Sequence, residues 1–213
     1  MRVSRICSTY LKYSKAYTGS MWRNSGELSP AMLRAAYGQG IFPMGEGDEI
    51  SWYRPRTRAI IPLDQFHISK SLARTLRLGR FEVTFDKDFT GVMAACADRD
   101  ETWITEPIKR AYLELHREGG AHSVEVWVDG ILAGGTYGVH LGAAFFAESK
   151  FHRVTDMSKV ALASLVGHLR ERGFELLEVQ YLTEHLQQFG TIEITGKDYA
   201  RRLERALSRD CQW

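Results

Sequence analysis

The chain has 213 residues, of which 44% are hydrophobic and 25% are charged, and its formal net charge at pH 7 is +2. This length fits one large domain, or one compact domain preceded by a smaller one. The mixture is typical of a globular protein and excludes a disordered chain. Because the net charge is close to neutral, nucleic-acid binding would require a local basic patch.

The cysteines and histidines give no sign of a metal site. Cys7, Cys96 and Cys211 are odd in number and far apart, which fits neither a disulfide framework nor metal-ligand spacing and suits a reducing compartment. The seven histidines are equally scattered, without a pair at HExxH spacing. We therefore expect neither a metal nor another cofactor.

The N-terminal region is basic, and we expect residues 1–28 to form a tail without catalytic role. Residues 1–26 contain no acid but carry three arginines and two lysines among several serines. Such a composition fits a transit peptide, a disordered basic tail or an overlong start with initiation at Met21, and we favour the last two. No apolar run approaches the roughly 18 residues of a membrane span, so we expect a cytoplasmic protein without membrane association.

A small N-terminal domain is expected over residues 29–100. Ser29-Pro30 combines a helix cap with a first-turn proline, and the short helix that follows ends at a glycine. Residues 40–55 are punctuated by glycine and proline and contain aromatic side chains, which is typical of a pocket rim.

A basic helix is predicted over residues 69–78. Its spacing places Lys70, Arg74 and Arg77 along one face. Arg80 extends this basic stripe beyond the end of the helix. The stripe suits the phosphates of a nucleic acid, although an ordinary solvated helix face has the same pattern.

The remaining chain alternates between strands and helices. Strands are expected at 81–85, 123–128, 131–139, 143–149, 176–181 and 192–194, and helices at 88–96, 107–117, 156–173, 184–188 and 199–207. Asp88 and Asp156 are expected to cap the helices that begin with them. A strand meander followed by a crossover helix, strand, helix and strand predicts an α/β (α+β) domain of the N-acetyltransferase-like type, which we assign to residues 101–213.

One feature of that fold is missing from the sequence. An acetyltransferase holds the pyrophosphate of acetyl-CoA with a Gly-rich loop at a helix N-terminus, where backbone N–H groups are free. The corresponding link, residues 149–155, contains no glycine. An acyl-CoA donor is therefore disfavoured, since a fold can remain while its donor differs.

Nine strings in sequence order resemble the leucyl/phenylalanyl-tRNA–protein transferase family. They are AYGQGIFPM at 36–44, WYRP at 52–55 running to Arg58, TWIT at 102–105, AY with LH at 111–116, AHSVEVW at 121–127, GGTYGV at 134–139, FAES at 146–149, SKVAL at 158–162, and Gln180 with His185 and Leu186. One string alone would be weak evidence, whereas nine in order cover nearly the whole chain after the basic tail.

The resemblance implies a donor, an acceptor and a product. The donor is Leu-tRNA or Phe-tRNA, whose acceptor stem the basic stripe would contact, and the acceptor is a protein whose first residue is Arg or Lys. The product carries a bulky apolar N-terminus that marks it for degradation. An acyl-CoA-dependent N-acyltransferase of the same fold and a non-catalytic tRNA-binding module are the alternatives, and we expect a monomer.

Glu178 and Gln180 are the expected catalytic residues. The reaction is aminolysis of an ester by an α-amine, whose pKa of about 7.7–8.0 leaves a useful neutral fraction at pH 7. Positioning and an oxyanion partner therefore matter more than a strong base. Two residues apart on a strand, an acid and an amide project from one face and can orient the amine. The family is similar here but usually has Asp in place of Glu178, and a solvated strand face is the alternative interpretation.

Further substrate contacts follow from the resemblance. Trp52, Trp103 and Tyr112 are expected around the 3′-terminal adenosine, because aromatic faces stack on any base, although they could equally belong to the core. Glu148 is expected to contact a substrate amino group unless it pairs with a neighbouring lysine.

Two residues depart from the family pattern at the amino-acid pocket. Lys150 stands where Met usually follows Glu-Ser, and Thr136 stands where an apolar residue usually separates Gly-Gly from Tyr-Gly. A lysine in a pocket for Leu or Phe is costly unless it is paired or reaches solvent. Either the amino-acid preference differs from Leu and Phe, or Phe145, Phe146 or Phe151 rebuilds the pocket.

Overall fold

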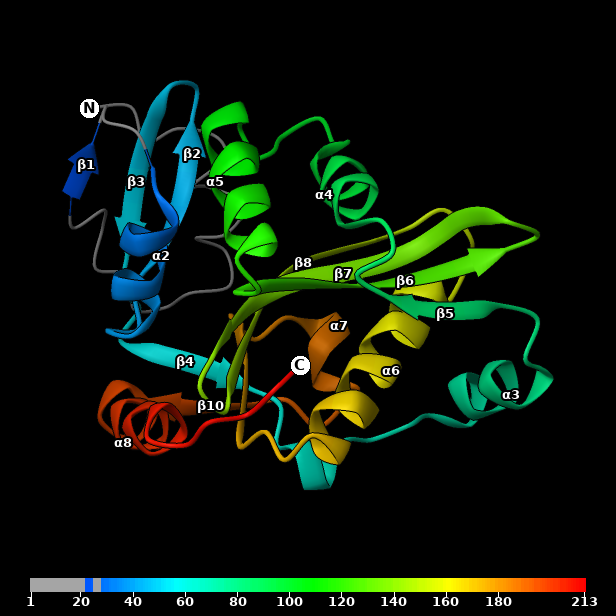
Figure 1. Ribbon diagram of the computed structural model, residues 1–213. Coiled ribbons are helices and arrows are strands. Elements are labelled where there is room, and N and C mark those ends of the chain that lie inside the picture. Colours follow the sequence, from blue (N-terminus) through cyan, green and yellow to red (C-terminus); the bar gives the residue numbers. More distant parts are fainter. Residues whose placement is uncertain (1–21, 25–27) are drawn as a thin grey trace.

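A computed structural model describes residues 22–24 and 28–213, and its strands form two β-sheets (Figure 1). The strands are β1 (Trp22–Asn24), β2 (Phe42–Glu46), β3 (Glu49–Tyr53), β4 (Thr57–Ile60), β5 (Glu82–Phe85), β6 (Ala121–Val128), β7 (Ile131–Leu141), β8 (Ala144–His152), β9 (Leu176–Gln180) and β10 (Ile192–Thr195). The smaller sheet has the order β1-β3-β2, and the seven-stranded sheet has the order β10-β4-β9-β8-β7-β6-β5. Only β8 and β9 pair in parallel among these described strands.

Helices cover both faces of the larger sheet. They are α2 (Pro30–Tyr37), α3 (Lys70–Leu78), α4 (Phe89–Ala97), α5 (Glu106–Arg117), α6 (Met157–Glu171), α7 (Glu184–Gln187) and α8 (Gly196–Leu207), with a 3-10 turn, η1, at Leu63–Gln65. Figure 1 shows α4 and α5 on one face of strands β6 to β8 and α6 on the opposite face. A sheet between two helical layers confirms the predicted α/β class.

Most helix starts follow from side-chain caps that the sequence displays. The Ser29 hydroxyl and the Asp88 carboxylate accept hydrogen bonds from backbone N–H groups of the first turn, as expected, and the Ser69 hydroxyl does the same for α3. Asp156 was expected to cap α6 in the same way, and that expectation is wrong. Its backbone is left-handed, with φ of 69°, and its carboxylate instead pairs with Lys159 at 2.8 Å.

The structure also alters the expected organisation of the N-terminal half. Residues 22–24 of the expected tail form β1, which pairs with β3, whereas residues 1–21 and 25–27 lie outside the described residues. Both β4 and β5 belong to the seven-stranded sheet, although they precede residue 100. The sheets thus separate between β3 and β4, and a domain boundary at residue 100 stays a prediction.

The larger sheet opens between its two parallel strands. The parallel pairing joins Ala144–Phe146 only to Leu176–Glu178, so β8 and β9 have no ladder beyond that point. On the other side of β8, the register to β7 shifts between Tyr137 and Gly138, whose partners are Ser149 and Ala147. Glu148 is therefore the extra residue of a β-bulge at the start of the opening.

We predict that Gly138→Ala destabilises the protein by about 1–3 kcal/mol or more, because a Cβ there would lie 2.2 Å from the Phe146 carbonyl oxygen, a backbone atom that cannot move freely. The matched variant is Gly167→Ala in α6, where no atom lies within 4 Å of an added Cβ and helix propensity favours Ala. Urea denaturation should show a loss for the first and no loss for the second. Equal stabilities would contradict the close approach of β7 and β8.

Candidate active site

A cavity of about 610 Å³ occupies the opening between β8 and β9. Its walls come from β7, the second half of β8, the end of β9, the last turn of α4, the start of α6, and α7. Four of the expected site residues line it, namely Thr136, Glu148, Lys150 and Gln180. Because β8 and β9 diverge here, residues that are far apart in the sequence line one cavity.

A chain of hydrogen bonds leads from the N-terminal helix to this cavity. The Tyr37 hydroxyl donates to Glu148 Oε1 at 2.6 Å and contacts the Tyr112 hydroxyl at 2.5 Å. Gln180 Nε2 lies 3.1 Å from both carboxylate oxygens of Glu148 and donates to them. Neutral donors therefore hold the Glu148 carboxylate from both sides, and Glu148 pairs with neither of its neighbouring lysines, contrary to the alternative that the sequence left open.

Burial dominates the electrostatics of this carboxyl group. Desolvation raises the pKa of Glu148 to about 8, with a further increase from the nearby charge of Glu178. Burial and the Glu148 carboxylate also raise the pKa of Tyr37 and of Tyr112, so both phenols stay neutral donors. The cavity wall thus holds a carboxyl group that can exchange a proton near neutral pH.

Glu178 has a separate and fully buried set of partners. Its carboxylate accepts hydrogen bonds from the Arg58 guanidinium, including one of 2.7 Å from Nε, and from the Tyr199 hydroxyl. The Arg58 guanidinium also stacks on the Tyr199 ring at 4.0 Å and donates to the Gly40 carbonyl. Glu178 is 1% exposed and does not line the cavity, so it anchors β9 to β4 and α8.

Gln180 departs from the regular strand geometry that we expected. Its φ is 61°, an uncommon value for a residue other than glycine, so the alternation of side chains along β9 ends there. The Gln180 and Glu178 side chains consequently have different partners rather than forming one acid–amide pair. The alternative of a solvated strand face is wrong for both residues, since both are buried.

The three expected aromatic contacts are buried away from the cavity. Trp52 is 6% exposed, Trp103 is 4% exposed and Tyr112 is fully buried. None of them lines the cavity, so a base could stack on these rings only after their surroundings opened. Their contact with an adenosine stays a prediction.

Phe146 also lies behind the cavity wall, with its ring centroid 4.9 Å from that of Tyr37. Phe145 packs against Trp213 at 5.2 Å and likewise does not line the cavity. Phe151 does line it. Of the three phenylalanines considered for a rebuilt amino-acid pocket, only Phe151 is therefore placed to contribute.

Lys150 and Thr136 face each other in the ladder between β7 and β8. The Thr136 hydroxyl donates to the Ser149 carbonyl at 2.9 Å. Burial lowers the pKa of Lys150 to about 8, with a further decrease from the neighbouring Arg99. Arg99 Nη2 in turn donates to the Lys150 carbonyl at 2.7 Å, which ties α4 to this part of β8.

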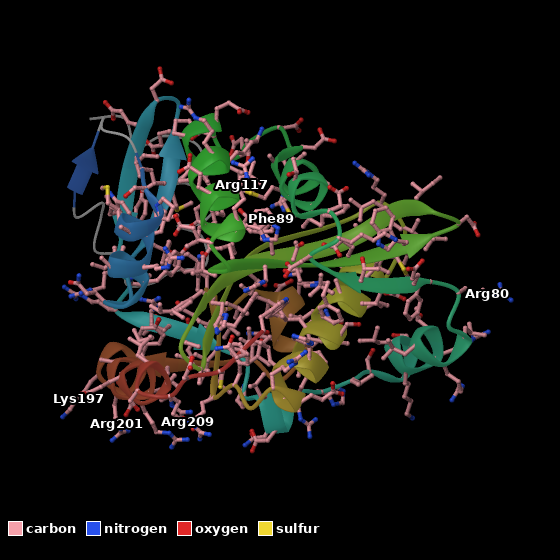
Figure 2. All side chains as sticks on the ribbon, in the orientation of Figure 1. Arg80, Phe89, Arg117, Lys197, Arg201 and Arg209 are labelled. Atoms are coloured by element: carbon pink, nitrogen blue, oxygen red, sulfur yellow. The ribbon has the colours of Figure 1, made fainter. Side chains whose placement is uncertain are left out.

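The basic stripe lies apart from the cavity. Lys70, Arg74, Arg77 and Arg80 are all exposed, and none of them forms an ion pair with another described residue. Figure 2 shows Arg80 pointing into solvent at the end of the molecule opposite to α8. The stripe is therefore available to phosphates, and its role in binding tRNA stays a prediction.

Sequence reasoning missed several residues that shape the site. Tyr37, Arg58 and His185 belong to the family-like strings but were given no role. Arg99 and Tyr199 carry no sequence signal, because their partners are about 50 and 21 positions away and only the fold joins them. His185 lines the cavity, and burial lowers its pKa to about 4, so it is neutral.

One histidine cluster lies elsewhere, where side chains of Asp86, His116 and His122 approach within 4.8 Å. The ring nitrogens of His122 already face Asp86 Oδ2 at 2.7 Å and the Gly119 carbonyl at 3.1 Å. His116 Nδ1 faces the Ala121 carbonyl at 2.8 Å. These hydrogen bonds account for the cluster as support for β6, and the absence of a metal stays an expectation.

A mixed sheet that opens between two parallel strands, with helices on both faces, is the arrangement of the N-acetyltransferase-like fold class. The profile described as leucyl/phenylalanyl-tRNA protein transferase matches residues 60–204, and that of the N-terminal domain of the same proteins matches residues 26–56. The chain belongs to the leucyl/phenylalanyl-tRNA–protein transferase family.

Individual relatives agree with this assignment. A leucyl/phenylalanyl-tRNA–protein transferase of Ruegeria pomeroyi is 52% identical over 184 residues, which cover 85% of this chain and 88% of the relative. One of Gloeobacter violaceus is 51% identical over 188 residues, which cover 87% and 97%. Among solved structures, FemX shares the fold with a TM-score of 0.51 at 14% identity, over 66% of this chain and 60% of FemX. Among the described residues, no helix is long and apolar enough to cross a membrane.

We predict that Glu148→Gln stabilises the protein at pH 9 more than at pH 5. A carboxyl group whose pKa rises from 4.5 to about 8 on folding favours the folded state less as pH rises through that window. At about 1.4 kcal/mol per pKa unit, the difference between the two pH values should be on the order of 3 kcal/mol.

Urea denaturation at pH 5 and at pH 9 would measure the effect of Glu148→Gln on the free energy of unfolding. Glu114→Gln, on the exposed face of α5, is the control. An equal effect of Glu148→Gln at pH 5 and pH 9 would show that the carboxyl group is not desolvated.

Proposed function

We propose that this protein transfers an amino acid from aminoacyl-tRNA to the N-terminal residue of an acceptor protein that begins with Arg or Lys. Family membership supports the reaction, and the acceptor preference follows the family resemblance. The protein acts in the cytoplasm as a monomer, and the product is marked for degradation by its new N-terminus. The observation that carries the proposal is the hydrogen-bonded chain that ends at Glu148 and Gln180 in the cavity wall.

The chemistry assigned to this chain is amine attack on an ester carbonyl. The acceptor's α-amine forms a bond to the carbonyl carbon, and the ester C–O bond to the ribose breaks. Glu148 receives the proton that the amine loses, because its pKa of about 8 is close to the value of about 7.7–8.0 for an α-amine. The proton then passes to the leaving ribose oxygen.

Gln180 orients the reactants, and Glu178 has a separate, positioning role. The Gln180 amide N–H donates to Glu148, which leaves its carbonyl oxygen to accept from the attacking amine. Glu178 does not line the cavity, so we assign it a positioning role through its ion pair with Arg58 rather than contact with substrate. Trp52, Trp103 and Tyr112 would contact the adenosine only after a rearrangement, as their burial requires.

The start of α6 disfavours the binding of an acyl-CoA donor. The Asp156 carboxylate lies beside the first turn of α6, where an acetyltransferase would bind a pyrophosphate, and it pairs with Lys159. A negative charge at that place opposes a second anion. The link before α6 also lacks the glycine that a close backbone approach needs.

We predict transfer of a radiolabelled amino acid from charged tRNA to peptides that begin with Arg or Lys, and weak transfer to peptides that begin with Ala or Asp. Gln180→Ala should lower kcat/KM by about 10²-fold or more with tRNA affinity nearly unchanged. Gln187→Ala, on the exposed side of α7, should leave both unchanged. Transfer from an acyl thioester alone would favour the acyl-CoA alternative, and unchanged turnover in Gln180→Ala would remove Gln180 from the mechanism.

The basic stripe gives a separate prediction about tRNA binding. Replacing Arg74 and Arg77 with Gln removes two exposed charges and should weaken binding, with the slope of log K against log salt falling by about 1–2. The matched control removes two exposed charges from α8, Lys197 and Arg202. Filter binding over a series of salt concentrations would compare them. An equal loss in both variants would mean that α3 does not contact the RNA specifically.

A further inference from the structure

Lys150 is a positively charged side chain without a negative partner in the wall of the cavity. Among the described residues it forms no hydrogen bond through its ammonium and no ion pair. The nearby Lys159, by contrast, is paired with Asp156 at 2.8 Å. Lys150 is half-buried, and an amine in a cavity wall that is left unpaired is costly unless something supplies the missing negative charge.

The surroundings of Lys150 add positive charge. Arg99 and Arg153 line the same cavity, and so does His185, whose imidazole is kept neutral by burial. The acids of the lining are Asp98, which is exposed at the end of α4, and Glu148, which Tyr37 and Gln180 hold. The part of the cavity around Lys150 therefore has an excess of hydrogen-bond donors and positive charge.

The side chain of the donor amino acid would decide how well the Lys150 ammonium is solvated in the cavity. An aliphatic or aromatic side chain would displace water from the ammonium and leave it still more poorly solvated. A carboxylate would replace the water with a charge-assisted hydrogen bond, which is among the strongest polar contacts in a protein. An enzyme discriminates strongly between two substrates when its site contains a polar group that the wrong substrate leaves unpaired.

We propose that the cavity selects a donor amino acid with an acidic side chain, whose carboxylate binds the Lys150 ammonium while its ester carbonyl lies beside Glu148 and Gln180. The proposal rests on the aminoacyl transfer described above and names its donor. The side-chain carboxylate remains ionised throughout and takes no part in bond formation. Arg99 acts as a positioning residue, because it holds the Lys150 carbonyl.

The test uses one tRNA body charged by a ribozyme with Glu, Asp, Gln, Leu or Phe, so that only the amino acid changes. The measured quantity is the ratio of kcat/KM for Glu to that for Leu, with an Arg peptide as acceptor. We expect a ratio above one in the wild type and a fall of at least tenfold in Lys150→Met. Lys150→Arg should keep the ratio above one, and Lys159→Met should leave it unchanged.

A wild-type ratio below one would overturn the proposal, and so would a Lys150→Met ratio within twofold of the wild type. Equal transfer of Gln and Glu would overturn the requirement for negative charge. Absence of transfer with every amino acid would instead contradict the proposed function, so the two failures are distinguishable. Thermal unfolding of each variant would check that it is folded.

Discussion

The buried ion pair between Arg58 and Glu178 is the interaction on which the rest of the site depends. It joins β4 to β9, which are neighbours near one edge of the seven-stranded sheet, and Tyr199 extends it to α8. The same guanidinium reaches the Gly40 carbonyl, so the turn after α2 is held to the sheet as well. Removing either charge would leave the other buried without compensation, which typically costs about 3–5 kcal/mol.

One guanidinium lies near two carboxyl groups but bonds to only one of them, and this imbalance defines the chemistry. Arg58 bonds to Glu178, whereas Glu148 receives only the neutral donors Tyr37 and Gln180. Two nearby acids in unlike environments can take unlike roles, because the uncompensated one is the more easily protonated. The fold therefore separates an acid that holds the strands together from one that can exchange a proton.

Local sequence signals were enough to predict the helices and strands. The arrangement of the site residues depends on long-range contacts, which such signals do not reveal. Ser29, Ser69 and Asp88 marked helix starts because a cap acts within its own first turn. Such signals failed at Asp156, where a left-handed backbone turns the carboxylate away from its usual role. We expected Glu178 and Gln180 to project from one face of a regular strand. That prediction was wrong because Gln180 has a positive φ, which cannot be deduced from neighbouring residues.

The aromatic residues are a second case in which the sequence does not decide the role of a side chain. Trp52 and Trp103 are the kind of residue that binds a base, but the same rings fill a core equally well. Burial alone separates the two roles, and it depends on packing between segments that are distant in the sequence, such as those joined by the Gly45 N–H and the Trp103 carbonyl. Tyr112 illustrates the intermediate case, because its ring is fully buried while its hydroxyl still reaches the site through Tyr37.

The bulge in β8 links these observations. Gly138 lets β7 approach the Phe146 carbonyl where any larger residue would collide, and the register shift beside it makes Glu148 the extra residue. A carboxylate at a bulge is released from the strict alternation of the strand, so it can meet Tyr37 and Gln180 while Lys150 remains paired in register with Thr136. The bulge therefore allows a single strand to present a carboxyl group and an ammonium to the same cavity without pairing them with each other.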